Sequence, residues 1–291
     1  MVRLAALLAS FAVSLGAASA QPAPADSITV TGEKLRAEID RYLGTVTTAT
    51  AIAGKIARWE RNSACPVAVG LKPEYLTFIT KRMRQVAQEI GAPFNTAAGC
   101  APNLRIVFTT APQALLDNVR KNHSALLGYT NSNRAADRVA QMIHPIQAWY
   151  TTETIDWNGQ RKKDVRVIGM CADIFAPDCP NAFKSSPFKT GSGLKSDFGQ
   201  VTIVADPSKL GDPPMGALAD LIAMLALSQP QLGAGCQNSV LDLAVKACAN
   251  PPDGFSTMDM GFLRGLYHMR GLAVGMRNPL AAQMEKDLSG K

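Results

Sequence analysis

The stretch VTIVADPSKLGDPPMGALADLIAMLALS, residues 201–228, decides the fold. It opens with Val201 to Val204, whose β-branched content predicts a strand. Pro214 then leads into Met215 to Ser228, a segment that is apolar nearly all round. A helix with no polar face belongs in the middle of a core. We therefore expect a strand followed by a central buried helix, and we work outward from this unit.

Patterns elsewhere predict further helices and strands. Helices are expected over 33–50, 73–90, 112–119, 134–142, 238–248 and 257–269, and strands over 28–31, 104–108, 146–157 and 165–168. Asn158-Gly159 is a tight-turn signal and predicts a hairpin near residues 146–168. This order favours an α+β fold over regular βαβ alternation. We expect residues 27–291 to form a single α+β domain, with a mixed or antiparallel sheet packed with helices and a helical C-terminal part.

The N-terminus predicts export. Arg3 precedes an apolar run from Leu4 to Leu15, and Ala18-Ser19-Ala20 follows, which are the parts of a signal peptide over residues 1–20. The run is shorter than the roughly 20 residues that span a bilayer. A Pro/Ala linker covers residues 21–26, and no later stretch is long and apolar enough to predict a transmembrane segment. We expect a soluble protein, periplasmic or secreted after cleavage near Ala20.

Composition limits the partners. Of the 291 residues 47% are hydrophobic, enough for a substantial core, and the formal net charge is +7. The positive charge permits weak contact with an anionic envelope surface. The basic residues are scattered, for example over 81–84 and 161–163, whereas nucleic-acid binders gather them on one face. We therefore expect no nucleic-acid partner.

The cysteines favour disulfides. Their number is even, and an oxidising compartment favours pairing. Six cysteines allow 15 pairings, and sequence alone does not choose among them. Short separations suggest three pairs. These are Cys65–Cys100, Cys171–Cys179 and Cys236–Cys248. The chain has no CxxC motif and its histidines lie far from the cysteines in sequence, so we expect no metal site.

Catalytic motifs are not apparent. None of the three histidines, His123, His144 and His268, lies in an HExxH arrangement, and the chain has no GxSxG elbow, Walker loop or GxGxxG fingerprint. We therefore expect no cofactor. The catalytic candidates that remain are Asp220, His144 and His268, together with a thiol, if one is free, at Cys65 or Cys171.

The buried helix carries a family resemblance. With Val201 to Val204 just before it, Ala219-Asp220-Leu221-Ile222-Ala223 resembles the C-terminal half of zincin-like metalloprotease domains, over about residues 201–267. The likeness is to a family of exported bacterial proteins that lack the HExxH motif. It implies that Ala219 and Ala223 stand where a zincin has its histidines, and Asp220 where it has the catalytic glutamate. A buried Asp220 then needs a hydrogen-bond partner or a raised pKa.

Three functions are open at this point. The first is an exported, non-catalytic binding or scaffold protein, a pseudo-metalloprotease, whose ligand is an unknown protein or small molecule. The alternative is a divergent periplasmic hydrolase built on Asp220, His144, His268 or a thiol. The third is an envelope-associated factor that uses its positive charge to lie against anionic surfaces. The missing motifs favour the first, so we expect a protein that is not an enzyme.

Overall fold

The computed structural model describes residues 32–95, 97–164, 193–233, 235–245, 248, 250–271 and 274–290. Within these residues one five-stranded sheet has the order β1-β2-β5-β3-β4. The strands are β1 (Pro66–Val69), β2 (Leu104–Phe108), β3 (Ile146–Ile155), β4 (Arg161–Lys163) and β5 (Lys195–Ala205). β1, β2 and β5 run parallel, whereas β3 is antiparallel to β5 and to β4. The sheet is therefore mixed and the fold is α+β, as predicted.

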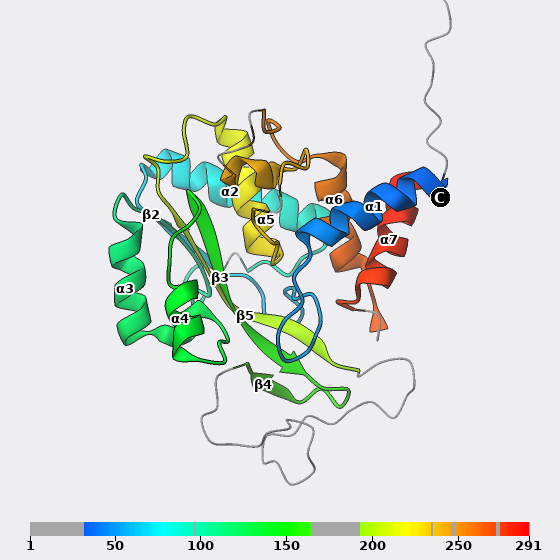
Figure 1. Ribbon diagram of the computed structural model, residues 1–291, viewed down its shortest axis with the longest axis horizontal. Coiled ribbons are helices and arrows are strands. Elements are labelled where there is room, and N and C mark those ends of the chain that lie inside the picture. Colours follow the sequence, from blue (N-terminus) through cyan, green and yellow to red (C-terminus); the bar gives the residue numbers. More distant parts are fainter. Residues whose placement is uncertain are drawn as a thin grey trace, which may run out of the picture.

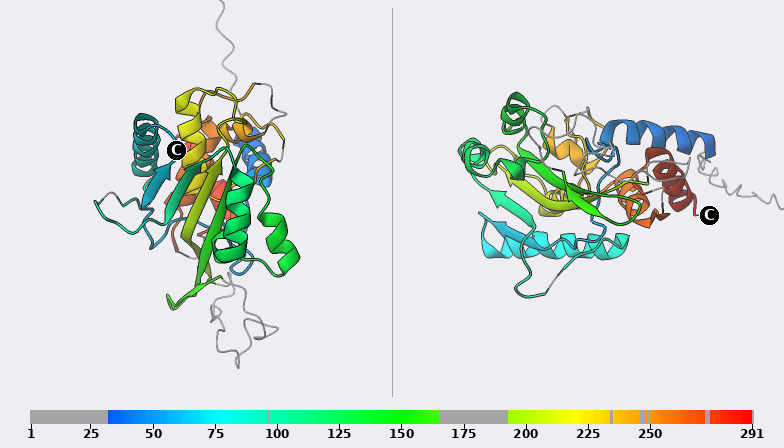
Figure 2. Two further views of the ribbon diagram at one scale, coloured as in Figure 1. Left: turned by 90° about the vertical axis from the view of Figure 1, so that its left-hand side faces the viewer. Right: turned by 90° about the horizontal axis from the view of Figure 1, so that it is seen from below.

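Helices cover both faces of this sheet. The elements are α1 (Gly32–Val46), α2 (Pro73–Ile90), α3 (Pro112–Asn122), the 3-10 turn η1 (Ser124–Leu127), α4 (Asn133–Val139), α5 (Met215–Leu227), the 3-10 turn η2 (Val240–Ala244), α6 (Thr257–His268) and α7 (Arg277–Ser289). α2 and α5 lie on one face, and α3, η1 and α4 on the other (Figures 1 and 2). α1, α6 and α7 pack together at one end of the molecule (Figure 1).

α5 is the central helix. Every residue from Ala217 to Leu227 is buried, and the helix packs between the sheet and α2. Its all-apolar sequence has no face that favours water, so burial on all sides is the stable arrangement. The prediction of a core helix over 215–228 is confirmed to within one residue.

A smaller core lies on the opposite face. It contains Leu116, Leu127, Trp149 and Val204, which join α3 and η1 to β3 and β5. Trp59 belongs to the main core at 1% exposure, whereas Trp157 at the hairpin turn is 46% exposed. Trp59 and Trp149 are therefore core-packing residues, and Trp157 is the exposed tryptophan.

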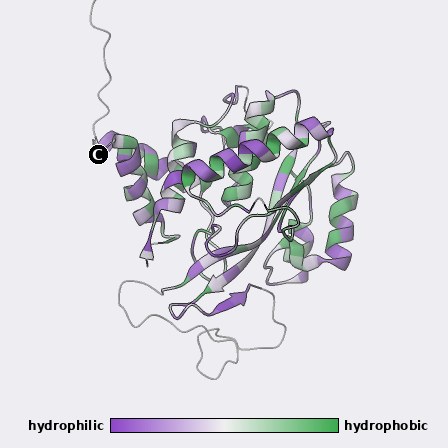
Figure 3. Ribbon diagram, turned by 180° about the vertical axis from the view of Figure 1, so that it is seen from behind, coloured by the Kyte–Doolittle hydropathy of each residue, from purple (hydrophilic) through white to green (hydrophobic). Residues whose placement is uncertain are grey.

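The hairpin forms at the expected turn. Asp156 accepts the N–H groups of Asn158 and Gln160 at 3.0 and 2.9 Å, and Gly159 has a φ of +81°. The return strand β4 begins at Arg161 and is hydrophilic along its length (Figure 3). The strands expected over 28–31 and 165–168 lie outside the described residues.

Several boundaries differ from the prediction. α1 ends at Val46 instead of Thr50, because the chain leaves the helix to form isolated bridges, Thr47 with Pro230 and Ala49 with Ile56. β5 begins at Lys195, six residues before the predicted strand. The helix expected over 238–248 is wrong, since only the short η2 turn forms there. α7 had no predicted counterpart.

Two disulfides tie loops to the fold. Cys65 is bonded to Cys100, and Cys236 to Cys248, around η2. Cys171 and Cys179 lie outside the described residues, as do the expected signal peptide over 1–20 and the linker over 21–26. Among the described helices, none has both the length and the apolar character needed to cross a membrane. The disulfides are compatible with an oxidising compartment.

Candidate functional site

Asp220 links the central helix α5 to α2 and to the loop before α6. Its carboxylate accepts hydrogen bonds from Nε and Nη2 of Arg82 on α2, at 2.6 and 3.3 Å. The backbone N–H of Phe255, in the loop before α6, donates to the same carboxylate at 3.1 Å. Both oxygens are therefore engaged, and the buried aspartate joins α5, α2 and the loop. It has the partners that a buried carboxylate requires.

The two alanines beside Asp220 are fully buried. Ala219 and Ala223 are each 0% exposed, and their methyl groups offer no lone pair to a cation. In the parts of the chain that the structure describes, no group of three or more His, Cys, Asp or Glu side chains is placed to hold a metal ion. These positions of α5 are core packing.

The candidate histidines lie in different surroundings. His144 lies in the loop before β3, where a Cβ added at Gly233 would stand 3.2 Å from its Cε1. His268 ends α6, and its Nδ1 is 3.4 Å from the carboxylate of Asp287 on α7. Because Asp220, His144 and His268 have different neighbours, the described contacts do not bring them together as a catalytic set.

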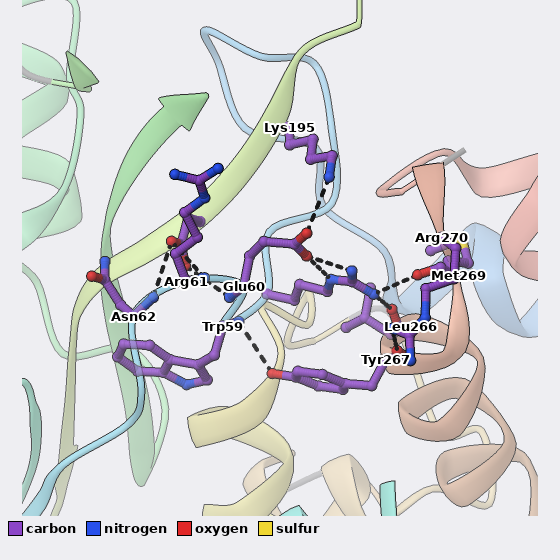
Figure 4. Close-up of polar contacts among 11 residues, drawn as sticks. Trp59, Glu60, Arg61, Asn62, Lys195, Leu266, Tyr267, Met269 and Arg270 are labelled. Atoms are coloured by element: carbon purple, nitrogen blue, oxygen red, sulfur yellow. Dashed lines mark hydrogen bonds and ion pairs between the residues drawn. The ribbon is translucent and has the colours of Figure 1, made fainter. Parts of the chain in front are cut away.

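The densest polar group surrounds Arg58 and Glu60 (Figure 4). Arg58 donates to the Glu60 carboxylate, and the other oxygen of Glu60 receives Lys195 Nζ at 3.1 Å. Arg58 Nη1 also reaches the carbonyls of Leu266 and Met269, at 2.5 and 3.2 Å. Cations are favourable at a helix C-terminus, so Arg58 stabilises the end of α6.

Asp197 completes this group, which we call the Arg58–Asp197 cluster. Its fully buried carboxylate accepts three successive backbone N–H groups, from Glu60, Arg61 and Asn62, at 2.9, 3.1 and 3.3 Å. Arg161 of β4 adds a fourth donor at 3.1 Å. Burial raises the pKa of the Asp197 carboxyl, and the backbone hydrogen bonds and Arg161 oppose that rise.

Aromatic groups extend the cluster into the core. The N–H of Trp59 donates to the Tyr267 hydroxyl at 3.2 Å (Figure 4). This hydroxyl donates to the carbonyl of Leu227 at 2.7 Å. The indole Nε1 of Trp59 donates to the carbonyl of Ala226 at 2.8 Å. The contacts connect residues 58–62 to β5, α5 and α6. We interpret the cluster as structural because its carboxylates are occupied by the protein itself.

An open polar region lies along the outer edge of β3. β4 pairs with β3 only at Glu153 to Ile155. Asp206 N–H donates to the Pro145 carbonyl at 2.8 Å, which shows that the backbone carbonyl of residue 145 faces β5. Asp164 N–H donates to the Thr152 carbonyl at 2.9 Å, which shows that the backbone carbonyl of residue 152 faces β4. Antiparallel pairing alternates along a strand, so the backbone groups of Ala148 and Tyr150 also point away from β5.

A groove of about 470 Å³, which we call the β3-edge groove, follows this edge. Its floor is Gln147 to Tyr150, one wall is Thr50 with Gln229, and the other is Tyr129 with Arg138. Among the described residues, no hydrogen bond reaches the backbone groups of Ala148 or Tyr150 on this side. The groove therefore combines unpaired backbone donors and acceptors with polar walls.

Gly128 closes one end of the groove. Its φ is +86°, and a Cβ added there would lie 2.4 Å from the carbonyl oxygen of Tyr150. Only glycine allows the chain to approach β3 so closely. Sequence reasoning missed this groove, because the pairing of β3 depends on where β4 begins and ends.

The fold and these sites define an α+β protein with a mixed sheet, cross-linked by disulfides and open along one sheet edge. Comparison with protein families, with curated proteins and with solved structures finds no match.

Proposed function

We propose that this chain is an exported, non-catalytic binding protein that takes an extended peptide segment along the β3-edge groove. The unpaired backbone groups of Ala148 and the unpaired N–H of Tyr150 carry the proposal, since Gly128 lies against the Tyr150 carbonyl oxygen. An extended segment that adds to a sheet edge gains main-chain hydrogen bonds, while pockets at the edge read alternate side chains. The partner class is therefore a protein or peptide with an extended, flexible stretch.

The surroundings of Asp220, Ala219 and Ala223 on α5 support a non-catalytic function. If the zincin-like resemblance holds, Asp220 stands where the catalytic glutamate would, and Arg82 and Phe255 occupy its carboxylate. Ala219 and Ala223 stand where the histidines would and are buried. On this proposal the chain is a pseudo-metalloprotease whose central helix holds the core together.

The two disulfides support an extracytoplasmic location. We infer a periplasmic or secreted protein whose signal peptide is removed near Ala20. Loss of Arg3 with that peptide leaves a formal charge of +6, obtained as +7 − 1, which favours weak contact with an anionic envelope surface.

Peptide selection tests the proposal. A displayed library of random dodecapeptides is screened against the mature protein, and a selected peptide is titrated by calorimetry into the wild type and Ala148→Pro. The proline removes one outward N–H, so we expect affinity to fall about tenfold or more, the effect of losing roughly 1.4 kcal/mol. Ala148→Ser keeps the N–H and serves as the matched control, with affinity near that of the wild type.

Two results contradict the proposal. One is a selected peptide that binds Ala148→Pro and the wild type equally well, which places the ligand elsewhere. The other is cleavage of the bound peptide, detected by mass spectrometry after incubation, which supports the hydrolase alternative. A cleavage rate that falls in Asp220→Asn, His144→Ala or His268→Ala would then identify the residue involved.

A further inference from the structure

A narrow apolar slot lies on the face of the sheet that α3 and η1 cover. Its volume is about 120 Å³, and its lining is apolar. The walls come from α3, η1, β2, β3 and β5. They include Leu116, Val119, Leu127, Trp149, Thr202 and Val204. The slot adjoins the smaller core and shares Leu127 and Trp149 with the lining of the β3-edge groove.

The mouth of the slot is polar and positive. Arg105 of β2 lines both the slot and the shallow hollow outside it, where it lies with Asn122, His123 and Gln200. Its Nη1 donates to the Gln200 side chain at 3.2 Å. No carboxylate lies within ion-pair distance of Arg105 in the described part of the chain. A guanidinium has five N–H donors in a fork that matches a carboxylate.

Thr202 of β5 also lines the slot, and its Oγ1 is buried without a hydrogen-bond partner among the described residues. The surface that faces the slot is apolar, so the slot suits a hydrocarbon group. An engineered apolar cavity of about 150 Å³ stays dry and binds benzene, so the slot is of the size for one small ring or branched chain.

We propose that this slot binds a small carboxylic acid with one apolar ring or branched chain. The apolar group enters among Leu116, Val119 and Trp149, and the carboxylate remains at the mouth on Arg105. Burial of the apolar part supplies affinity, and the charge-assisted hydrogen bond selects acids over their neutral analogues. The proposal rests on Arg105 and the apolar slot and not on the peptide proposed for the β3-edge groove, although Leu127 and Trp149 line both cavities.

Titration with benzoate tests the inference. Backbone amide resonances of the ¹⁵N-labelled mature protein are followed by NMR as benzoate is added. We expect saturable shifts at Leu116, Val119 and Val204. Arg105→Gln should weaken benzoate binding about tenfold or more, since a hydrogen bond to a charged group contributes at least that factor. Benzamide, which has no charge, should bind weakly and be unaffected by this variant.

Two further variants sharpen the test. Arg134→Gln removes an exposed arginine of α4 and changes the net charge equally, so it should leave benzoate binding unchanged. Val119→Phe places a ring in the slot, so it should abolish the shifts while dispersed spectra report an intact fold. Absence of saturable shifts at the slot residues in the wild type overturns the proposal. So does an Arg105→Gln variant that binds benzoate as tightly as the wild type.

Discussion

The Arg58–Asp197 cluster, on residues 58–62 and β5, and the β3-edge groove, on the neighbouring strand, use their polar groups in opposite ways. In the cluster, Asp197 is fully buried and accepts three backbone N–H groups and Arg161. In the groove, the outward N–H and C=O groups of Ala148 and Tyr150 have no partner among the described residues. Satisfied buried polar groups hold elements together, whereas an unpaired edge is a template for another chain. We therefore assign stability to the first region and binding to the second.

Among the variants that test this comparison, Asp197→Ala should lower the free energy of unfolding the most. Asp197→Ala removes the acceptor of three backbone N–H groups and one of the two carboxylate partners of Arg161, so we expect the free energy of unfolding to fall by about 3–5 kcal/mol. Urea denaturation measures this loss. The matched control is Asp137→Ala, whose carboxylate is 63% exposed in its ion pair with Arg120 and should contribute under about 1 kcal/mol. Equal losses in the two variants would mean that the cluster is not structural.

Proline substitution at adjacent positions of β3 tests the direction of the backbone groups. Gln147 points its N–H toward β5, so Gln147→Pro breaks a ladder hydrogen bond and should destabilise the protein by about 3 kcal/mol. The N–H of Ala148 points into the groove, where proline is tolerated on an edge. Ala148→Pro should therefore cost less, about 1 kcal/mol, by thermal or urea unfolding. The reverse order would show that Ala148 faces β5 and that the groove has no free edge.

Two carboxyls should give opposite pH dependences. Burial opposes ionisation of Glu60, but Arg58 and Lys195 overcome it and lower its pKa. Its contribution to stability is present above the unfolded pKa and is lost as pH falls through the lower folded pKa. Burial raises the pKa of Asp164, whose side-chain donors among the described residues are the Thr152 and Thr154 hydroxyls, so its ionisation lowers stability as pH rises above the unfolded value.

Unfolding free energies measured across the acidic range separate these cases. On acidification the wild type should lose stability relative to Glu60→Gln and gain stability relative to Asp164→Asn. Each slope is at most about 1.4 kcal/mol per pH unit, the limit for one proton. Slopes of the same sign would contradict the assignment of Glu60 to a satisfied cluster and of Asp164 to a poorly compensated site.

Sequence patterns predicted the elements whose signals are local. α2 runs from Pro73 to Ile90 as predicted, because proline favours a first turn and Gly91 adopts the left-handed conformation that ends a helix. α6 also formed near its predicted bounds, and the side chain of Ser256 caps its first turn. Each of these signals depends on a few neighbouring residues.

The elements that patterns missed depend on partners far away in the chain. α7 buries only Leu280, Ala281 and Met284, too few for a clear helical pattern. It packs on α6, where a Cβ at Gly261 or Gly265 would stand about 3 Å from α7 side chains. η2 is short because Asp242 accepts the N–H groups before it and the chain is extended again at Val245.

The same division holds for the candidate sites. The apolar run over 215–228 required a buried helix in any compact fold, since water disfavours every face of it. The ion pair of Asp220 with Arg82, the burial of Asp197 and the free edge of β3 required the folded chain, because each joins residues that are 35 or more positions apart or depends on which strand lies beside β3. Hydrophobic periodicity acts over a few residues, whereas hydrogen-bond satisfaction and strand pairing are properties of the assembled structure.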